Sequence, residues 1–90
     1  MNKNDLIEFV RESNSLSKAK AEEVVDSVMA FIVTQVSEGE EVKLIGLGTF
    51  LKIKRKSRYG RNPQTGEKIT IPESYHPKFR PGAAFKEAVK

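Results

Sequence analysis

The chain contains no cysteine and no tryptophan, and it has a single histidine, His76. Disulfide bridges and thiolate metal sites are therefore excluded, and one histidine cannot build a zinc cluster. A chain of 90 residues without such cross-links has a marginal core, because so short a chain buries only about 60% of its unfolded surface. We therefore expect either unusually good packing or association with a second copy.

Long hydrophobic runs are also absent. Residues 1–5 lack the basic cluster and apolar stretch of a secretory signal. No stretch approaches the ~20 apolar residues that a membrane span needs. Together with the absence of cysteine, these features favour a protein of the reducing cytoplasm without a membrane partner.

The patterns of an enzyme are missing as well. The acidic residues Glu22, Glu23 and Asp26 cluster on one predicted helix, but nothing in the sequence suggests a pocket that would perturb their pKa values. We interpret them as a solvated face, with Lys18 and Glu22 as an ion pair one turn apart. There is no phosphate-binding glycine loop and no nucleophile–base pair. We therefore expect no catalytic residue, no cofactor, no metal and no small-molecule substrate.

Charge is distributed unevenly along the chain. Residues 1–41 carry four basic and nine acidic side chains, a net charge of −5, whereas residues 42–90 carry twelve basic and three acidic ones, a net charge of +9. A strongly basic half favours a polyanionic partner for that part of the chain. An acidic helix surface that serves only solubility is the alternative, and the local clustering of the basic residues speaks against it.

Helical periodicity dominates the first 40 residues. Asn2 followed by Asp5 has the pattern of a helix N-terminus, and this helix is predicted to end near residues 13–14. A second helix is predicted after the cap residue Ser17. Gly39 supplies its stop, because glycine adopts a left-handed conformation without strain. The two predicted helices form an αα-hairpin.

From residue 41 the apolar period changes from about four to two, which predicts β-strands. Strands are expected at residues 42–44, 49–56 and 68–71. Turn chemistry is expected at residues 58–66, and Gly82 opens a short C-terminal helix. The expected order is α-α-β-β-β-α in one α+β domain.

The segment 52–61 contains six basic residues and no acid. Packing such a segment against an apolar core is unfavourable, because unpaired buried charge is costly. The residues that follow, to about position 74, include few large apolar side chains. We therefore expect residues 54–74 to project as a two-stranded arm.

The second predicted helix is apolar on more than one side, through Val25, Val28, Met29, Phe31 and Ile32. A monomer of this size cannot cover so much hydrophobic surface. The sequence therefore predicts a dimer whose two basic arms extend from one body. Duplex DNA suits such arms, because Lys and Arg release the counterions condensed on its phosphates and a two-stranded ribbon fits a groove.

Asn62 and Pro63 lie in the predicted turn of the arm. Pro63 presents an apolar ring without an N–H donor, which suits a wedge that unstacks base pairs and kinks the duplex. Proline also shapes ordinary turns, and the pattern alone leaves both roles open.

A family resemblance is carried by Gly46-Leu47-Gly48-Thr49-Phe50, Gly60-Arg61-Asn62-Pro63-Gln64-Thr65-Gly66, Ile71-Pro72, Phe79 and Pro81-Gly82. Over its whole length the chain resembles the HU/IHF family of bacterial histone-like DNA-binding proteins, most of all the HU type. The resemblance implies an IHF-like fold and an intertwined homodimer. It divides the chain into a helical base (1–40), a β-saddle (41–82) whose three-stranded sheet extends into the arm (about 54–74), and a C-terminal helix (83–90).

The resemblance also implies which residues contact double-stranded DNA. It implies that the arms wrap the minor groove and that Pro63 intercalates at each of two kinks. The arm residues expected to take part are Arg55, Arg58, Arg61, Asn62 and Pro63, supported by Lys52, Lys54, Lys56 and Lys68. The body residues are Lys3, Arg80, Lys86 and Lys90, with backbone N–H groups near Gly46 and Gly48. An ion pair between Lys3 and Asp26 would compete with DNA for that lysine.

Three residues depart from the usual family pattern. Leu47 stands where phenylalanine is more common, Phe85 where leucine is common, and Ala83 where a basic residue is common. The missing charge at Ala83 predicts weaker DNA contacts along the flanks of the body, for which Arg80 can compensate.

The expected function is architectural. The chain lacks a set of base-reading side chains on a helix, so selectivity is expected from DNA deformability, with a preference for nicked, gapped or pre-bent DNA in the nucleoid. An IHF-like, site-specific subunit that pairs with a sister chain is one alternative. An RNA-binding protein is another, although the arm has few aromatic residues to stack bases.

Overall fold

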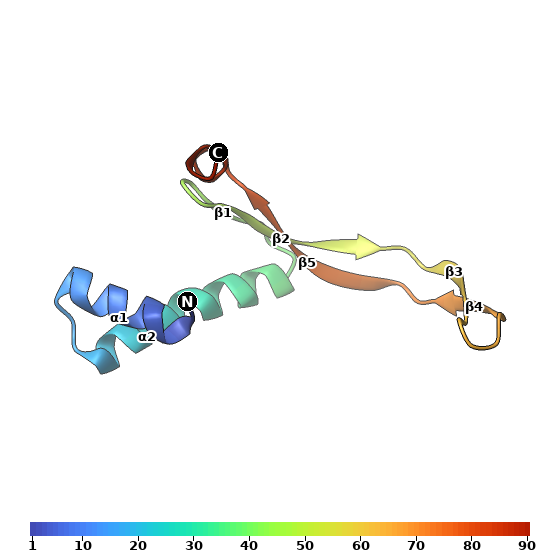
Figure 1. Ribbon diagram of the computed structural model, residues 1–90, viewed down its shortest axis with the longest axis horizontal. Helices are drawn as coiled ribbons and strands as arrows, with labels where there is room; N and C mark the ends of the chain where they lie inside the picture. Colours follow the sequence, from blue (N-terminus) through green and yellow to red (C-terminus); the bar gives the residue numbers. More distant parts are fainter. The chain divides into compact units, whose positions relative to one another are not determined.

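The structure is a computed structural model that describes residues 1–90 (Figure 1). It contains two compact units, Met1–Gln35 and Val36–Lys90. The elements in chain order are α1 (Lys3–Asn14), α2 (Lys18–Ser37), β1 (Val42–Leu44), β2 (Gly48–Arg55), β3 (Arg58–Arg61), β4 (Lys68–Ile71), β5 (Ser74–Pro81) and α3 (Ala83–Ala88). The predicted α+β class is confirmed, with two N-terminal helices, an antiparallel sheet with an arm, and a short C-terminal helix.

Both long helices begin at the predicted caps. The Asn2 side chain accepts a hydrogen bond from the Asp5 N–H at 3.1 Å, and the Asp5 carboxylate accepts one from the Asn2 N–H at 2.8 Å. This reciprocal capping box satisfies two backbone donors of the first turn. Ser17 caps α2 through a single bond, because its Oγ accepts from the Lys20 N–H at 3.2 Å. Gly39 follows α2 in the left-handed conformation, with φ +95°, as its sequence position predicts.

The core of the helical unit is small. Ile7, Ala21 and Val25 are buried together, and Val10 and Leu16 pack against them. The large apolar side chains that remain between 46% and 68% exposed are Leu6, Phe9, Val28, Met29, Phe31 and Val33. The helices therefore bury only one part of their apolar surface within this unit.

The sheet unit is built around the central strand β2. Its strand order is β1-β2-β5, and all pairs are antiparallel. The pairing of β2 with β5 runs from Gly48 opposite Pro81 to Arg55 opposite Ser74. Helix α3 packs against one face, where the rings of Phe50 and Phe79 lie 4.8 Å apart and those of Phe79 and Phe85 lie 6.1 Å apart. The sheet thus has an aromatic face at the end that carries α3.

Two strand assignments differ from the sequence prediction. Residues 74–81 form the third strand of the sheet, although no strand was predicted there, whereas residues 68–71 are a strand within the arm that was expected at about 54–74. The prolines at 77 and 81 argued against a strand. However, β5 is an edge strand that pairs only with β2. Proline is tolerated in an edge strand because the position of its missing N–H can face solvent rather than a neighbouring strand. Residues 58–61, predicted as turn, are the strand β3, because they pair with β4.

Candidate nucleic-acid interface

The arm is a two-stranded antiparallel ribbon at the end of the sheet opposite α3 (Figure 1). After β2 and β5 part at Arg55 and Ser74, pairing resumes between β3 and β4, from Arg58 opposite Ile71 to Arg61 opposite Lys68. Both faces of this ribbon are exposed to solvent over most of its residues. The β3–β4 ladder thus extends the β2–β5 pairing and carries, at its far end, the turn that contains Asn62 and Pro63.

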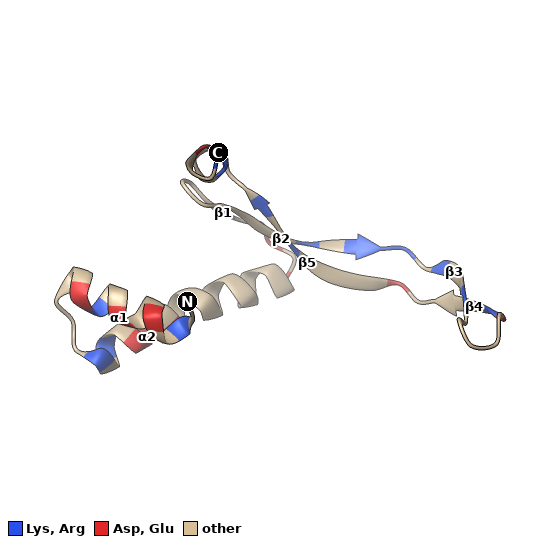
Figure 2. Ribbon diagram, viewed as in Figure 1, with Lys and Arg blue, Asp and Glu red and all other residues tan.

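Lys and Arg residues concentrate along the strand of the arm that continues β2 into β3 (Figure 2). Arg55, Lys56, Arg58 and Arg61 are exposed, and none of them forms an ion pair. Four like charges within seven positions repel one another, so an anionic partner would relieve that repulsion. These four residues are therefore positioned and free to contact phosphates.

Two other predicted contact residues, Lys52 and Lys54, interact with groups of the same chain. Lys52 Nζ donates to the Ser37 carbonyl at the end of α2, at 2.9 Å, and lies 4.6 Å from the centre of the Tyr75 ring. Lys54 Nζ lies 3.1 Å from the carboxylate of Glu73, which precedes β5. Contact of either lysine with a phosphate must therefore compete with an internal interaction, which the sequence pattern does not reveal.

The register of β3 and β4 separates two faces of the ribbon, because directly opposite residues point to the same side. One face carries Tyr59, Arg61, Lys68 and Thr70, and the other carries Arg58, Gly60, Ile69 and Ile71. Lys68 Nζ lies 5.2 Å from the centre of the Tyr59 ring, a cation–π distance. A Cβ atom on Gly60 would lie 3.0 Å from Ile71 Cδ1, so the absence of a side chain at position 60 allows the Ile71 side chain to lie close to the β3 backbone.

The same rule places further cations on one face of the sheet. Lys43, Thr49 and Arg80 form one row across β1, β2 and β5, and Lys78 lies opposite Leu51 two positions along β2. Lys43, Lys78 and Arg80 therefore share a face. Of these three, only Arg80 was predicted as a contact residue. The alternation of Lys78 and Arg80 was the available signal, and it was missed because no strand was predicted there.

The tip of the arm is closed by hydrogen bonds on either side of Pro63. The Asn62 N–H donates to the Glu67 carbonyl at 2.8 Å, and the Gly66 N–H donates to the Asn62 carbonyl at 2.7 Å. Gly66 has φ +74°, a conformation that favours glycine. Pro63 is exposed. The structure thus presents the proline ring to solvent at the end of the arm.

The two glycines of the β1–β2 turn differ in their surroundings. Gly46 is exposed, with φ +96° and open space where a Cβ would lie. Gly48 is buried, and a Cβ there would lie 2.4 Å from the Arg80 carbonyl oxygen and 2.7 Å from the Phe79 ring. Packing alone therefore requires glycine at position 48, whereas Gly46 has an accessible backbone.

Lys3 in the helical unit is paired. Its Nζ lies 2.6 Å from the Asp26 carboxylate, and both side chains are about half exposed. The hydrogen bond to Asp26 raises the pKa of Lys3 above its ordinary value, because the carboxylate stabilises the charged form of the lysine. The expected ion pair is therefore present, and a phosphate that Lys3 contacts must compete with Asp26.

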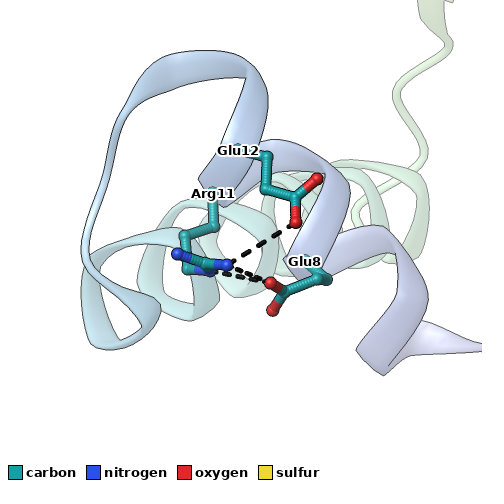
Figure 3. Close-up of polar contacts among 3 residues, drawn as sticks. All are labelled: Glu8, Arg11 and Glu12. Carbon is teal, nitrogen blue, oxygen red and sulfur yellow. Dashed lines mark hydrogen bonds and ion pairs between the residues drawn. The ribbon is translucent and has the colours of Figure 1, made fainter.

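Several acidic residues of the helices form ordinary surface ion pairs. Arg11 Nε donates to Glu8 at 3.0 Å, the guanidinium makes a second contact with the same carboxylate, and Glu12 lies 3.6 Å away (Figure 3). The hydrogen bond from Arg11 lowers the pKa of Glu8 below its usual value. The pair expected between residues 18 and 22 is wrong, because the structure pairs Lys20 with Glu23 at 3.6 Å instead.

The remaining predicted contact residues lie in the C-terminal segment. Lys86 and Lys90 are exposed, and Lys90 lies 3.5 Å from Glu87. No group of three or more His, Asp or Glu side chains is close enough to hold a metal ion. No helix has both the length and the hydropathy that crossing a membrane requires.

Comparisons with known proteins agree with this geometry. A family model for bacterial DNA-binding proteins matches residues 1–90. The chain is 49% identical over 89 residues to DNA-binding protein HU 1 of Bacillus subtilis, covering 99% of this chain and 97% of that protein. It is 49% identical over 90 residues to DNA-binding protein HU of Geobacillus stearothermophilus, with both proteins covered completely.

Solved structures show the same fold. A cocrystal structure of Anabaena HU with DNA has a TM-score of 0.90 and 42% sequence identity, and the match covers 99% of this chain and 97% of that one. The structure of HU from Thermotoga maritima has a TM-score of 0.69 and 28% identity, with both chains covered completely. The fold of this chain is thus that of known HU proteins.

Proposed function

Because this chain belongs to the bacterial DNA-binding protein family and is of the HU type, we propose that it bends double-stranded DNA as an architectural protein of the cytoplasmic nucleoid. The family is one of DNA-binding proteins rather than enzymes. The Anabaena relative was crystallised with DNA, which supports the same ligand for this chain.

The observation that carries the proposal is the arm. It combines four unpaired exposed cations with an exposed proline at its tip. Arg55, Lys56, Arg58 and Arg61 neutralise phosphates and release counterions, which supplies affinity without reading sequence. Pro63 inserts between base pairs and opens one step, and the resulting kink lets the duplex wrap more of the protein.

The body extends the contact surface. Lys3, Arg80, Lys86 and Lys90 are exposed or half-exposed cations outside the arm that can meet phosphates beyond the kinks. Gly46 is exposed in the β1–β2 turn, which supports a further contact between its backbone N–H and a phosphate. Lys52, Lys54 and Lys68 support the arm chiefly through their internal partners.

We further propose that two copies act together as a homodimer. The exposed apolar side chains of α1 and α2 offer a second copy the hydrophobic surface that a folded body of this size needs to bury. A hollow of about 500 Å³ beside α1 is lined in part by Leu6 and Phe9, and side chains of a second copy can pack into it. Two arms then act on one duplex.

Binding should depend on how easily the DNA deforms. Smooth bending of a 20–30 bp site costs on the order of 1–6 kcal/mol, so nicked, gapped or pre-bent DNA is favoured over intact linear duplex. Low sequence specificity follows, because the arm contacts the backbone and the minor groove presents a degenerate pattern.

A salt-titrated binding series on linear, nicked and gapped DNA tests this function. We expect affinity to fall steeply with salt and to be higher for nicked and gapped DNA at every salt concentration. Equal affinity for the three forms would refute bending. Double-stranded RNA serves as a competitor, and stronger competition by RNA than by DNA would point to RNA as the ligand.

A further inference from the structure

Asn62 holds the tip of the arm together. Its N–H donates to the Glu67 carbonyl at 2.8 Å, its carbonyl accepts from the Gly66 N–H at 2.7 Å, and its side-chain Oδ1 accepts from the Gln64 N–H at 2.9 Å. The first two bonds close the loop. The third bond, from side chain to backbone, bridges the residue in between, which is Pro63.

This bridge restricts the orientation of the proline ring. The pyrrolidine ring fixes φ of Pro63 near −65°. A hydrogen bond that an asparagine side chain accepts from the N–H two residues later forms a local turn that also restricts ψ of the residue in between. The ring that this bond closes also contains the Asn62–Pro63 peptide, so the direction of the proline ring relative to the ribbon is restricted before any DNA is bound.

The bridge also removes a polar group from the leading edge of the tip. Pro63 has no N–H, and the N–H that follows it, on Gln64, already has an acceptor within the loop. A donor without a partner is costly to place in an apolar base stack. The Asn62 carboxamide thus makes insertion of the tip easier as well as better oriented.

We propose that the Asn62 carboxamide is a positioning group for Pro63, acting through the proline in place of the direct DNA contact that the family resemblance implies. This inference rests on the proposed function, because it concerns how the wedge is aimed. Thr65 assists, since its Oγ1 accepts from the Glu67 N–H at 3.3 Å.

A double-mutant cycle on DNA kinking tests the proposal. Kinking is measured by energy transfer between the ends of a gapped duplex, for the wild type, Asn62→Ala, Pro63→Ala and the double variant. We expect Asn62→Ala to lower the ratio of kinked to unkinked complexes about five-fold, the factor that corresponds to one net hydrogen bond. In the Pro63→Ala background the same change should alter the ratio less than about two-fold, because the group that Asn62 positions is gone.

The salt dependence of binding separates positioning from direct contact. Asn62→Ala should leave the slope of log K against log salt unchanged, since the proposal assigns no phosphate to this side chain. Gln64→Ala is the matched control, because it keeps the backbone N–H that Asn62 binds, and its kinking should equal that of the wild type. The positioning role would be overturned if Asn62→Ala lowered the kinking ratio about five-fold both in the wild type and in the Pro63→Ala variant. It would also be overturned if Asn62→Ala reduced the slope of log K against log salt.

Hydrogen exchange in the free protein tests the turn independently of DNA. The Gln64 amide should exchange about five-fold faster in Asn62→Ala, whereas Asn62→Asp keeps the acceptor oxygen and should exchange like the wild type. Unchanged exchange in Asn62→Ala would refute the turn. If the turn is present but the wild type does not kink DNA, the proposed function fails and the cause lies outside Asn62.

Discussion

Single residues divide the basic segment into two groups. Lys52 and Lys54 look equivalent to Arg55 and Arg58 in the sequence, since all lie in one run of cations. In the structure the two lysines have partners within the chain, whereas the two arginines have none. Arginine also offers a rigid fork that matches phosphate oxygens. We therefore expect the arginines to dominate DNA contact.

Alanine substitution distinguishes these two groups. Arg58→Ala should lower the magnitude of the salt slope by about 0.9 for each phosphate that is no longer neutralised, so by about 1.8 for the two arms of a dimer. Lys52→Ala should leave the slope unchanged and lower the free energy of unfolding by about 1 kcal/mol, through loss of its hydrogen bond to Ser37. Fluorescence anisotropy over a salt series and urea unfolding measure both. If Arg58→Ala and Lys52→Ala lowered the salt slope of binding equally, the division of the basic residues into two groups would be wrong.

Gly48 and Gly46 form a second matched pair. Both have positive φ, but only Gly48 lies against other atoms. Gly46→Ala should cost about 1–2 kcal/mol of stability, the cost of a left-handed alanine. Gly48→Ala should cost about 1–3 kcal/mol more, because its methyl group meets Phe79 and the Arg80 backbone. Denaturant unfolding gives both values, and equal losses would mean that the structure around Gly48 relaxes freely.

At the scale of elements, local signals predicted the helices better than the strands. The sequence predicted the helix caps at Asn2 and Ser17 and the end of α2 at Gly39, because a cap involves residues within one helical turn. Strand β5 was not predicted, because prolines at 77 and 81 obscure it and its partner β2 lies about 25 residues earlier in the chain. Strand β3 was interpreted as a turn because it lies in a segment of turn-forming residues, and only its pairing with β4 makes it a strand.

At the scale of the whole molecule, the unburied apolar surface is the dominant feature. Six large apolar side chains of α1 and α2 remain 46% exposed or more. No large side chain is completely buried. A single-domain protein that kept this surface in water would gain little from the hydrophobic effect. The proposed association of two copies would bury this apolar surface.

The proposed dimerisation makes stability depend on protein concentration. The thermal midpoint should rise with protein concentration, because the folded dimer is favoured by mass action. Phe31→Glu should lower the midpoint strongly and shift sedimentation toward monomer, although Phe31 is 56% exposed here. Glu22→Gln, an exposed change on the same helix, is the control and should have little effect. A midpoint independent of concentration, with Phe31→Glu as stable as the control, would refute the dimer.

The sequence by itself determined the helix limits, the basic arm with Asn62 and Pro63 at its turn, and the family. These depend on caps, periodicity and a motif, which are local along the chain. Only the tertiary structure decided that residues 74–81 complete the sheet, that Lys43 and Lys78 share a face with Arg80, and that Lys52 is held by Ser37 and Tyr75. The physical reason is that strand register and side-chain partnership join residues far apart in sequence, and no local pattern encodes which cation meets which partner.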